Sequence, residues 1–93
     1  MLRTPAGQRR LDILEWLREP AAHFPAHRVV PEAGVSTEAV AAKLGVPRQV
    51  ADTHLELLTS LGLLRARRVR RRTYYRRDEV RIAEVARMFE KGW

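Results

Sequence analysis

The chain of 93 residues contains no cysteine, which excludes disulfide bridges, zinc ribbons and thiolate metal sites and leaves the redox compartment open. Lysine is also scarce: Lys43 and Lys91 are the only lysines among the 18 basic residues, and the other 16 are arginines. No apolar run approaches the ~20 residues that span a bilayer, and the first residues show no hydrophobic stretch like that of a signal peptide. We therefore expect a cytoplasmic protein without a membrane partner.

The usual motifs of catalysis are absent as well. The sequence has no nucleophile elbow, no glycine-rich phosphate loop and no HExxH pattern. His23 and His27 have the i, i+4 spacing of a helical zinc or nickel site, but Pro20 and Pro25 interrupt any helix across them. We expect a protein that is not an enzyme and has no cofactor, with His23 and His27 as weak metal candidates.

The length of the chain suits a single domain, residues 1–93. Its positive charge is concentrated in one segment. Arg65–Arg77 contains eight arginines and no acid, so it carries +8, while the other 80 residues hold 10 basic and 11 acidic groups. Arginine matches phosphate geometry, so this segment indicates a polyanionic partner such as nucleic acid. The alternatives are a solvated basic loop or an arginine-rich genome, and genome bias would not concentrate the arginines.

Hydrophobic spacing and capping residues predict a mainly α-helical chain with a small β-hairpin. The expected helices are Gln8–Arg18, a helix capped by Ser36 or Thr37 that stops at Gly45, Pro47–Leu61, and Glu79–Lys91. Pro20–Gly34 is rich in proline and predicts a loop. Leu63–Arg68 and Thr73–Arg77 predict two strands, and the tip between them, Val69–Arg72, lacks the glycine of a tight hairpin turn. We expect that tip to be long and loose.

The order of these elements is that of a winged helix-turn-helix, and particular residues extend the likeness. They are Leu44-Gly45-Val46, His54-Leu55, Leu58, Leu61-Gly62-Leu63-Leu64, Arg67-Arg68, Tyr74-Tyr75-Arg76, Asp78-Glu79 and His23-Phe24-Pro25. This set resembles the core of ArsR-type bacterial transcriptional regulators over roughly Leu11 to Phe89. MarR-like and other winged-helix families share the architecture and stay open.

The resemblance implies a sequence-specific regulator, a repressor, that binds a palindromic DNA operator as a homodimer. The recognition helix would be Pro47–Leu61 in the major groove, and the wing (Arg65–Arg77) would contact the backbone or the minor groove. By position, the DNA contacts would be Arg48, Gln49, Asp52, Thr53 and His54 on the recognition helix, Ser36 and Thr37 at the preceding helix N-terminus, and Arg67, Arg68, Arg70, Arg71, Arg72 and Tyr74 on the wing.

The recognition helix departs from the family in its charge. Asp52 stands where the family commonly has serine, Thr53 where it often has a basic residue, and Ser36–Leu64 has a net charge of −1. Arg48 and Gln49 suit guanine and adenine, respectively. Asp52 could accept a hydrogen bond from cytosine, orient Arg48 four residues earlier, or repel phosphate.

The resemblance also implies that two subunits pair through their first and last helices. In the last helix the apolar residues cover well over half the circumference, more than a terminal helix buries in its own domain. The expected dimer contacts are Leu11, Leu14, Trp16, Ile82, Val85, Ala86, Phe89 and Trp93.

Two further questions stay open at the level of sequence. The first question is whether the protein has an effector. The residues with which members of the family bind metals are missing here, an organic effector or a protein partner remains possible, and the sequence shows no pocket for an effector. The alternative function is a winged-helix interaction module whose basic hairpin docks an acidic protein. The acidic balance of the recognition helix slightly favours that alternative.

Overall fold

The computed structural model describes residues 4–90, and its first element is helix α1 (Pro5–Arg18). Thr4 caps α1 because its hydroxyl accepts a hydrogen bond from the Gly7 backbone N–H at 2.9 Å. Pro5 fits the first turn, where a missing N–H costs nothing. The helix therefore begins three residues before the predicted start at Gln8, and it buries Ile13 and Leu17.

The prediction of a loop over Pro20–Gly34 is wrong in part. That segment contains the short helix α2 (Pro20–His23), the 3₁₀ turn η1 (Ala26–Arg28) and strand β1 (Val29–Val30), and it leads into β2 (Gly34–Ser36). Such short strands depend on their pairing partners rather than on local propensity. Gly34 makes the pairing with β4 possible: its φ is +104°, and a Cβ there would lie 1.9 Å from the Tyr75 carbonyl oxygen.

The helix-turn-helix consists of α3 (Thr37–Leu44) and α4 (Arg48–Ser60), as predicted. The Ser36 hydroxyl caps α3 by accepting from the Ala39 N–H at 3.2 Å. Gly45, with φ +71°, ends α3 in the left-handed conformation, and Pro47 precedes α4. The predicted recognition helix is thus one residue too long at each end.

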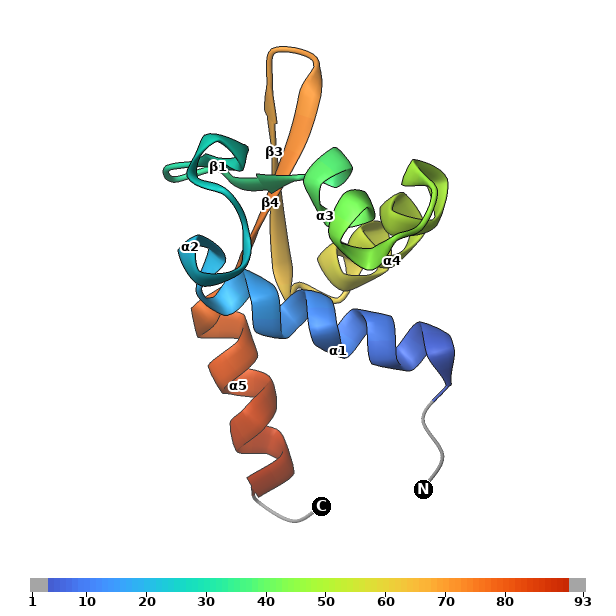
Figure 1. Cartoon of the computed structure of the whole chain (residues 1–93). Helices are drawn as coiled ribbons and strands as arrows, with labels where there is room; N and C mark the ends of the chain where they lie inside the picture. Colours follow the sequence, from blue (N-terminus) through green and yellow to red (C-terminus); the bar gives the residue numbers. More distant parts are fainter. Residues whose placement is uncertain (1–3, 91–93) are drawn as a thin grey trace.

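The wing is formed by β3 (Leu64–Val69) and β4 (Arg72–Arg77), which stand out from the helices in Figure 1. Within residues 4–90 the strands form one antiparallel sheet in the order β1-β2-β4-β3. The tip differs from expectation. Val69 pairs directly with Arg72, so Arg70 and Arg71 make a tight two-residue turn. Arg70 takes φ +58° in place of the missing glycine.

One hydrophobic core joins the helices to the sheet. Its fully buried side chains come from distant parts of the chain and include Ile13, Val35, Val40, Leu55 and Leu64. Last in the chain, α5 (Glu79–Glu90) leaves the body beside the C-terminal end of α1 and has no buried residue (Figure 1). Asp78 caps it by accepting from the Arg81 N–H at 3.0 Å. The observed fold is mainly α-helical with a small sheet, as predicted.

No helix among residues 4–90 combines the length and the apolar character required to cross a bilayer.

Candidate nucleic-acid interface

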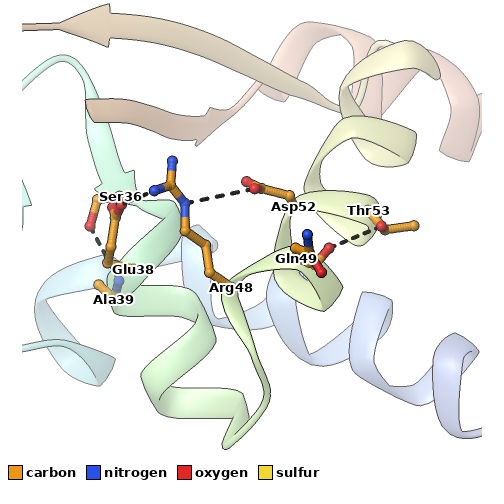
Figure 2. Close-up of polar contacts among 7 residues, drawn as sticks. All are labelled: Ser36, Glu38, Ala39, Arg48, Gln49, Asp52 and Thr53. Atoms are coloured by element: carbon orange, nitrogen blue, oxygen red, sulfur yellow. Dashed lines mark hydrogen bonds and ion pairs between the residues drawn. The ribbon is translucent and has the colours of Figure 1, made fainter. Parts of the chain in front are cut away.

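Arg48, at the first position of α4, is held between two carboxylates (Figure 2). Its Nη1 lies 3.3 Å from Glu38 Oε2 on α3, and its Nε lies 3.7 Å from Asp52 Oδ2 one turn along α4. The Arg48 side chain remains 60% exposed. Ion pairs this exposed are weak, so Arg48 can exchange a carboxylate for a base or a phosphate. Of the three roles open to Asp52, orienting Arg48 is the one that a contact in the structure supports directly.

Gln49 and Thr53 lie one turn apart on the exposed face of α4. The Thr53 hydroxyl donates to the Gln49 backbone carbonyl at 3.0 Å, as Figure 2 shows. Because this bond occupies the Thr53 hydroxyl proton, Thr53 presents mainly its methyl group and its oxygen lone pairs to a partner. Gln49 keeps an exposed amide, which can donate and accept.

His54 does not occupy the surface position expected of a DNA contact. It is 4% exposed, and its Nδ1 accepts a hydrogen bond from Arg10 Nε of α1 at 3.4 Å. Burial lowers the pKa of His54 below its ordinary value, and the positive charges of Arg10 and Arg9 lower it further. Ala51, Leu55 and Leu58 are buried on the same helix face. Helical periodicity therefore assigns His54 to the core, and we remove it from the candidate contacts.

Ser36 and Thr37 are buried too, with exposures of 2% and 1%. The Ser36 hydroxyl is used in capping α3, and the Thr37 side chain is buried rather than directed toward solvent. The expectation that these hydroxyls contact phosphate is therefore corrected: what α3 can offer a phosphate is its backbone N–H groups.

The strand register divides the wing into two faces. Pairing sets Arg67 opposite Tyr74 and Ala66 opposite Tyr75, so the first pair lies on one face and the second on the other. Tyr75 is 5% exposed and belongs to the core, whereas Tyr74 is half-buried. Adjacent residues of a strand point to opposite faces of the sheet, which is why the two tyrosines differ in burial. The face away from the core carries, besides Arg67 and Tyr74, the side chains of Arg65, Arg72 and Arg76.

The arginines at the base of the wing have structural partners. Arg65 Nε lies 3.0 Å from Asp78 Oδ2, and Arg77 Nε lies 3.0 Å from Glu79 Oε2. Arg77 also donates to the Leu14 carbonyl of α1 at 2.9 Å. The hydrogen bond from the Arg81 backbone, followed by that from Arg65, lowers the pKa of Asp78. These contacts tie the wing to α1 and α5.

The other six arginines of the wing differ from Arg65 and Arg77. Within residues 4–90 none of them forms an ion pair with an acid: Arg67, Arg68, Arg70, Arg71, Arg72 and Arg76. All six are exposed. The candidate interface therefore combines a projecting group of uncompensated arginines with a helix surface where Arg48 is already partly neutralised.

Two residues that the sequence reasoning did not assign to this surface lie beside the wing. A polar cleft of about 240 Å³, which we call the wing cleft, is lined by His27, Arg28, Ser36, Glu38, Arg72 and Tyr74. His27 and Arg28 come from η1, inside the segment expected to be a loop. The available signal was Arg28 directly before Val29-Val30, a basic residue at the start of a β-branched pair.

His23 and His27 are not brought together as a metal site. His23 ends α2, whereas His27 lies in η1, and the two side chains line different clefts. The described part of the chain, 4–90, contains no group of three or more His, Asp or Glu side chains placed to hold a metal ion.

The expected dimer contacts divide into two groups. Leu14 and Trp16 pack against the chain's own core, and the Trp16 ring meets that of Phe24 edge-on at 6.4 Å. Leu11 is 47% exposed and Phe89 70% exposed. On α5, Ile82 and Val85 are half-buried and Ala86 is exposed, while Trp93 lies outside the described residues. An apolar surface on α5 and Leu11 therefore remains, while Leu14 and Trp16 are partly covered by the chain's own core.

Comparison with known proteins finds similarity to a transcriptional regulator. No protein-family model matches the chain. The uncharacterized HTH-type transcriptional regulator YbzH of Bacillus subtilis (strain 168) is 36% identical over 83 residues, which cover 87% of this chain and 83% of YbzH. Among solved structures, NolR from Sinorhizobium fredii aligns with 99% of this chain and 97% of its own, with a TM-score of 0.46 and 16% identity.

Proposed function

The chain belongs to the HTH-type transcriptional regulators, and we propose that it is an ArsR-type winged-helix repressor that binds a palindromic operator in double-stranded DNA as a homodimer. Residues 1–93 act as one DNA-binding domain in the cytoplasm, where bacterial DNA lies. In this proposal α4 enters the major groove and the wing contacts the backbone and the minor groove beside it. The relative is named as a regulator and not as an enzyme, and we propose no catalytic activity.

The observation that carries this proposal is the group of six exposed wing arginines without acidic partners. Self-repulsion among so many like charges disfavours the isolated hairpin, and a polyanion relieves it. Each phosphate that an arginine neutralises releases counterions, which supplies affinity without sequence choice. The wing projects from the body in Figure 1, as a segment reaching along a duplex must.

Sequence choice, in contrast, is assigned to α4. Arg48 leaves Glu38 or Asp52 only for a partner that compensates the lost ion pair, and the O6 and N7 atoms of guanine do so with two hydrogen bonds. Gln49 can pair with adenine in the same manner. We therefore propose that the wing supplies affinity while Arg48 and Gln49 select bases.

The test compares two variants on DNA first selected by the wild-type protein from a random pool, where a palindrome is expected. Replacing Arg70, Arg71 and Arg72 together by Ala should weaken binding to all sequences. It should also reduce the salt dependence by about one unit of slope per lost phosphate contact. Gln49→Ala should instead change which bases are enriched. Arg87→Ala on α5 is the charge control for the wing variant. Equal losses on selected and random DNA from both changes would contradict the division.

A second candidate function is supported by the carboxylates around Arg48. Glu38 and Asp52 place negative charge where DNA would approach α4, and in this alternative the wing docks an acidic protein instead. The two functions separate in the selection experiment. An interaction module would enrich no DNA sequence and would bind a poly-glutamate peptide with the salt dependence proposed above for DNA.

The homodimer in this proposal is supported by the apolar residues of α5, which are half-buried or exposed. Ile82, Val85 and Phe89 lie on a helix that buries none of its residues in its own subunit. A second copy would cover this surface and place two recognition helices about 34–36 Å apart, one turn of the duplex.

A further inference from the structure

A second cleft lies between the α2–η1 segment and α3, and we call it the α3 cleft. It has a volume of about 310 Å³. Its apolar surface comes from Phe24, Pro25, Ala39 and Ala42, and its charged or titratable side chains are His23, Arg28 and Lys43. Among residues 4–90, no acidic side chain lines it. The cleft is therefore apolar on its floor and basic along its rim.

Lys43 lies over two aromatic rings, and one of them, Phe24, lines this cleft. Its Nζ lies 5.0 Å from the centroid of the Trp16 ring and 5.8 Å from that of Phe24. Such cation–π contacts orient the ammonium group but leave its charge uncompensated. In the described part of the chain neither Lys43 nor Arg28 forms an ion pair with an acid. Two basic side chains thus border one apolar cleft without a carboxylate between them.

We propose that the α3 cleft binds a small organic acid with an aromatic or branched apolar body. The body packs on Phe24, Ala39 and Ala42, and the carboxylate lies between Lys43 and Arg28. The volume is at the lower end of the range for small-molecule sites, roughly 300–1,000 Å³. A neutral analogue leaves both cations unpaired, and an inorganic anion leaves the apolar floor uncovered. The arrangement therefore selects for a molecule that has both parts.

This site also connects to the DNA surface, a step that rests on the proposed function. Arg28 lines both the α3 cleft and the wing cleft, where it lies with Arg72 and Tyr74. A carboxylate that engages Arg28 withdraws a cation from the DNA side. The acid and the DNA then compete for one guanidinium, so each lowers the affinity of the other by the same factor. The acid acts as an effector that releases the regulator from its operator.

Calorimetry on the full chain without DNA tests the site itself. The probes are benzoate, 4-methylpentanoate and indole-3-acetate, each paired with its neutral amide, with sodium acetate and inorganic phosphate as anions lacking an apolar body. We expect at least one acid to bind with 1:1 stoichiometry at submillimolar Kd, and its amide to bind at least tenfold more weakly. If no acid binds, or if acetate and phosphate bind as well as the acids, the proposal is overturned.

Two variants locate the binding in the cleft. Lys43→Met removes one cation and keeps the length of the side chain. Ala42→Glu places a carboxylate in the apolar floor of the cleft, at an exposed position of α3 where a helix tolerates glutamate. Each should reduce the affinity for the acid at least tenfold, while Arg87→Met on α5 should not change it. Far-ultraviolet circular dichroism and Tm confirm that each variant is folded. Unchanged affinity in both cleft variants would contradict the assignment.

A gel shift with the selected DNA then tests the connection. The bound acid should lower DNA affinity, and Arg28→Met should weaken DNA binding and make it insensitive to the acid. If an acid binds in the calorimeter but does not change DNA affinity, the connection to DNA is overturned and the binding site itself is still supported. Failure to bind DNA at all counts against the proposed function and not against the calorimetric result.

Discussion

At the residue scale, the carboxylate of Asp52 lies 3.7 Å from Arg48 on the surface that we assign to DNA. Asp52→Asn removes one negative charge facing the phosphates and frees Arg48 in part. A unit charge at about 4 Å in water is worth about 1 kcal/mol, so we expect roughly fivefold tighter DNA binding. Fluorescence anisotropy at fixed salt measures this change.

The control for Asp52→Asn is Glu84→Gln, which removes the same charge from α5. Glu84 is exposed on α5, outside the surface that we assign to DNA, so its replacement should alter DNA affinity much less. Weaker binding of the Asp52 variant to the selected DNA alone would instead indicate that the Asp52 carboxylate orients Arg48 or accepts a charge-assisted hydrogen bond from a base.

His54 provides a pH dependence whose sign follows from its burial. Its folded-state pKa is lowered, so the unfolded chain takes up a proton before the folded one does. The stabilisation is complete above the ordinary histidine pKa of about 6.5 and is lost as pH falls through the lowered folded-state pKa. We expect the free energy of unfolding in urea to decrease on acidification from about pH 7.5 to 5.

Replacing His54 by Leu removes this titration and should flatten the pH dependence of the unfolding free energy. His23→Gln, at a half-buried position at the end of α2, is the matched control and should retain the wild-type slope. Identical slopes for wild type and the His54 variant over that range would rule out His54 as the source.

At the element scale, the tight turn of the wing carries a conformational cost that the sequence does not avoid. Arg70 adopts φ +58°, where a side chain is disfavoured, and Arg71 does not. Arg70→Gly should raise the unfolding free energy by about 0.5–1 kcal/mol, whereas Arg71→Gly should lower it. Both variants lose one wing cation and should bind DNA more weakly.

Thermal unfolding together with DNA binding separates the two effects. The glycine variants should differ in Tm but agree in their loss of DNA affinity. If both lower Tm equally, the turn conformation at Arg70 is not a source of strain.

At the scale of the whole molecule, the position of α5 determines the expected assembly. Val85 is half-buried within one subunit and lies between Ile82 and Phe89 on successive turns of α5. Val85→Asp places a charge in the proposed interface, where it would have no partner, and should dissociate the dimer. Sedimentation at micromolar concentration should change from twice the subunit mass to 10.7 kDa.

Arg87→Asp supplies the control for this variant because Arg87 is exposed on the same helix. It changes the charge more than Val85→Asp does, yet it should remain dimeric. A wild-type protein that sediments at the mass of one subunit would contradict the dimer and the half-site spacing derived from it.

The sequence by itself determined the elements whose signals are local. Periodic leucines predicted α1, Ser36 and Gly45 delimited α3, and Pro47 preceded α4. Caps and periodicity act within a few residues, so they can be read without knowing the fold. The concentration of arginine in residues 65–77 is equally visible in the sequence, and by its charge alone it indicates a polyanionic partner.

Only the tertiary structure decided which arginines are uncompensated and which polar residues are buried. Arg77 is tied to Leu14, 63 positions away, and His54 accepts from Arg10, 44 positions away. Strand β2 depends on β4 in the same way, because two or three residues form a strand only when a distant segment pairs with them. Arg28 lies between two clefts for that reason as well: its surroundings are set by contacts between segments far apart in the sequence, which no local pattern records.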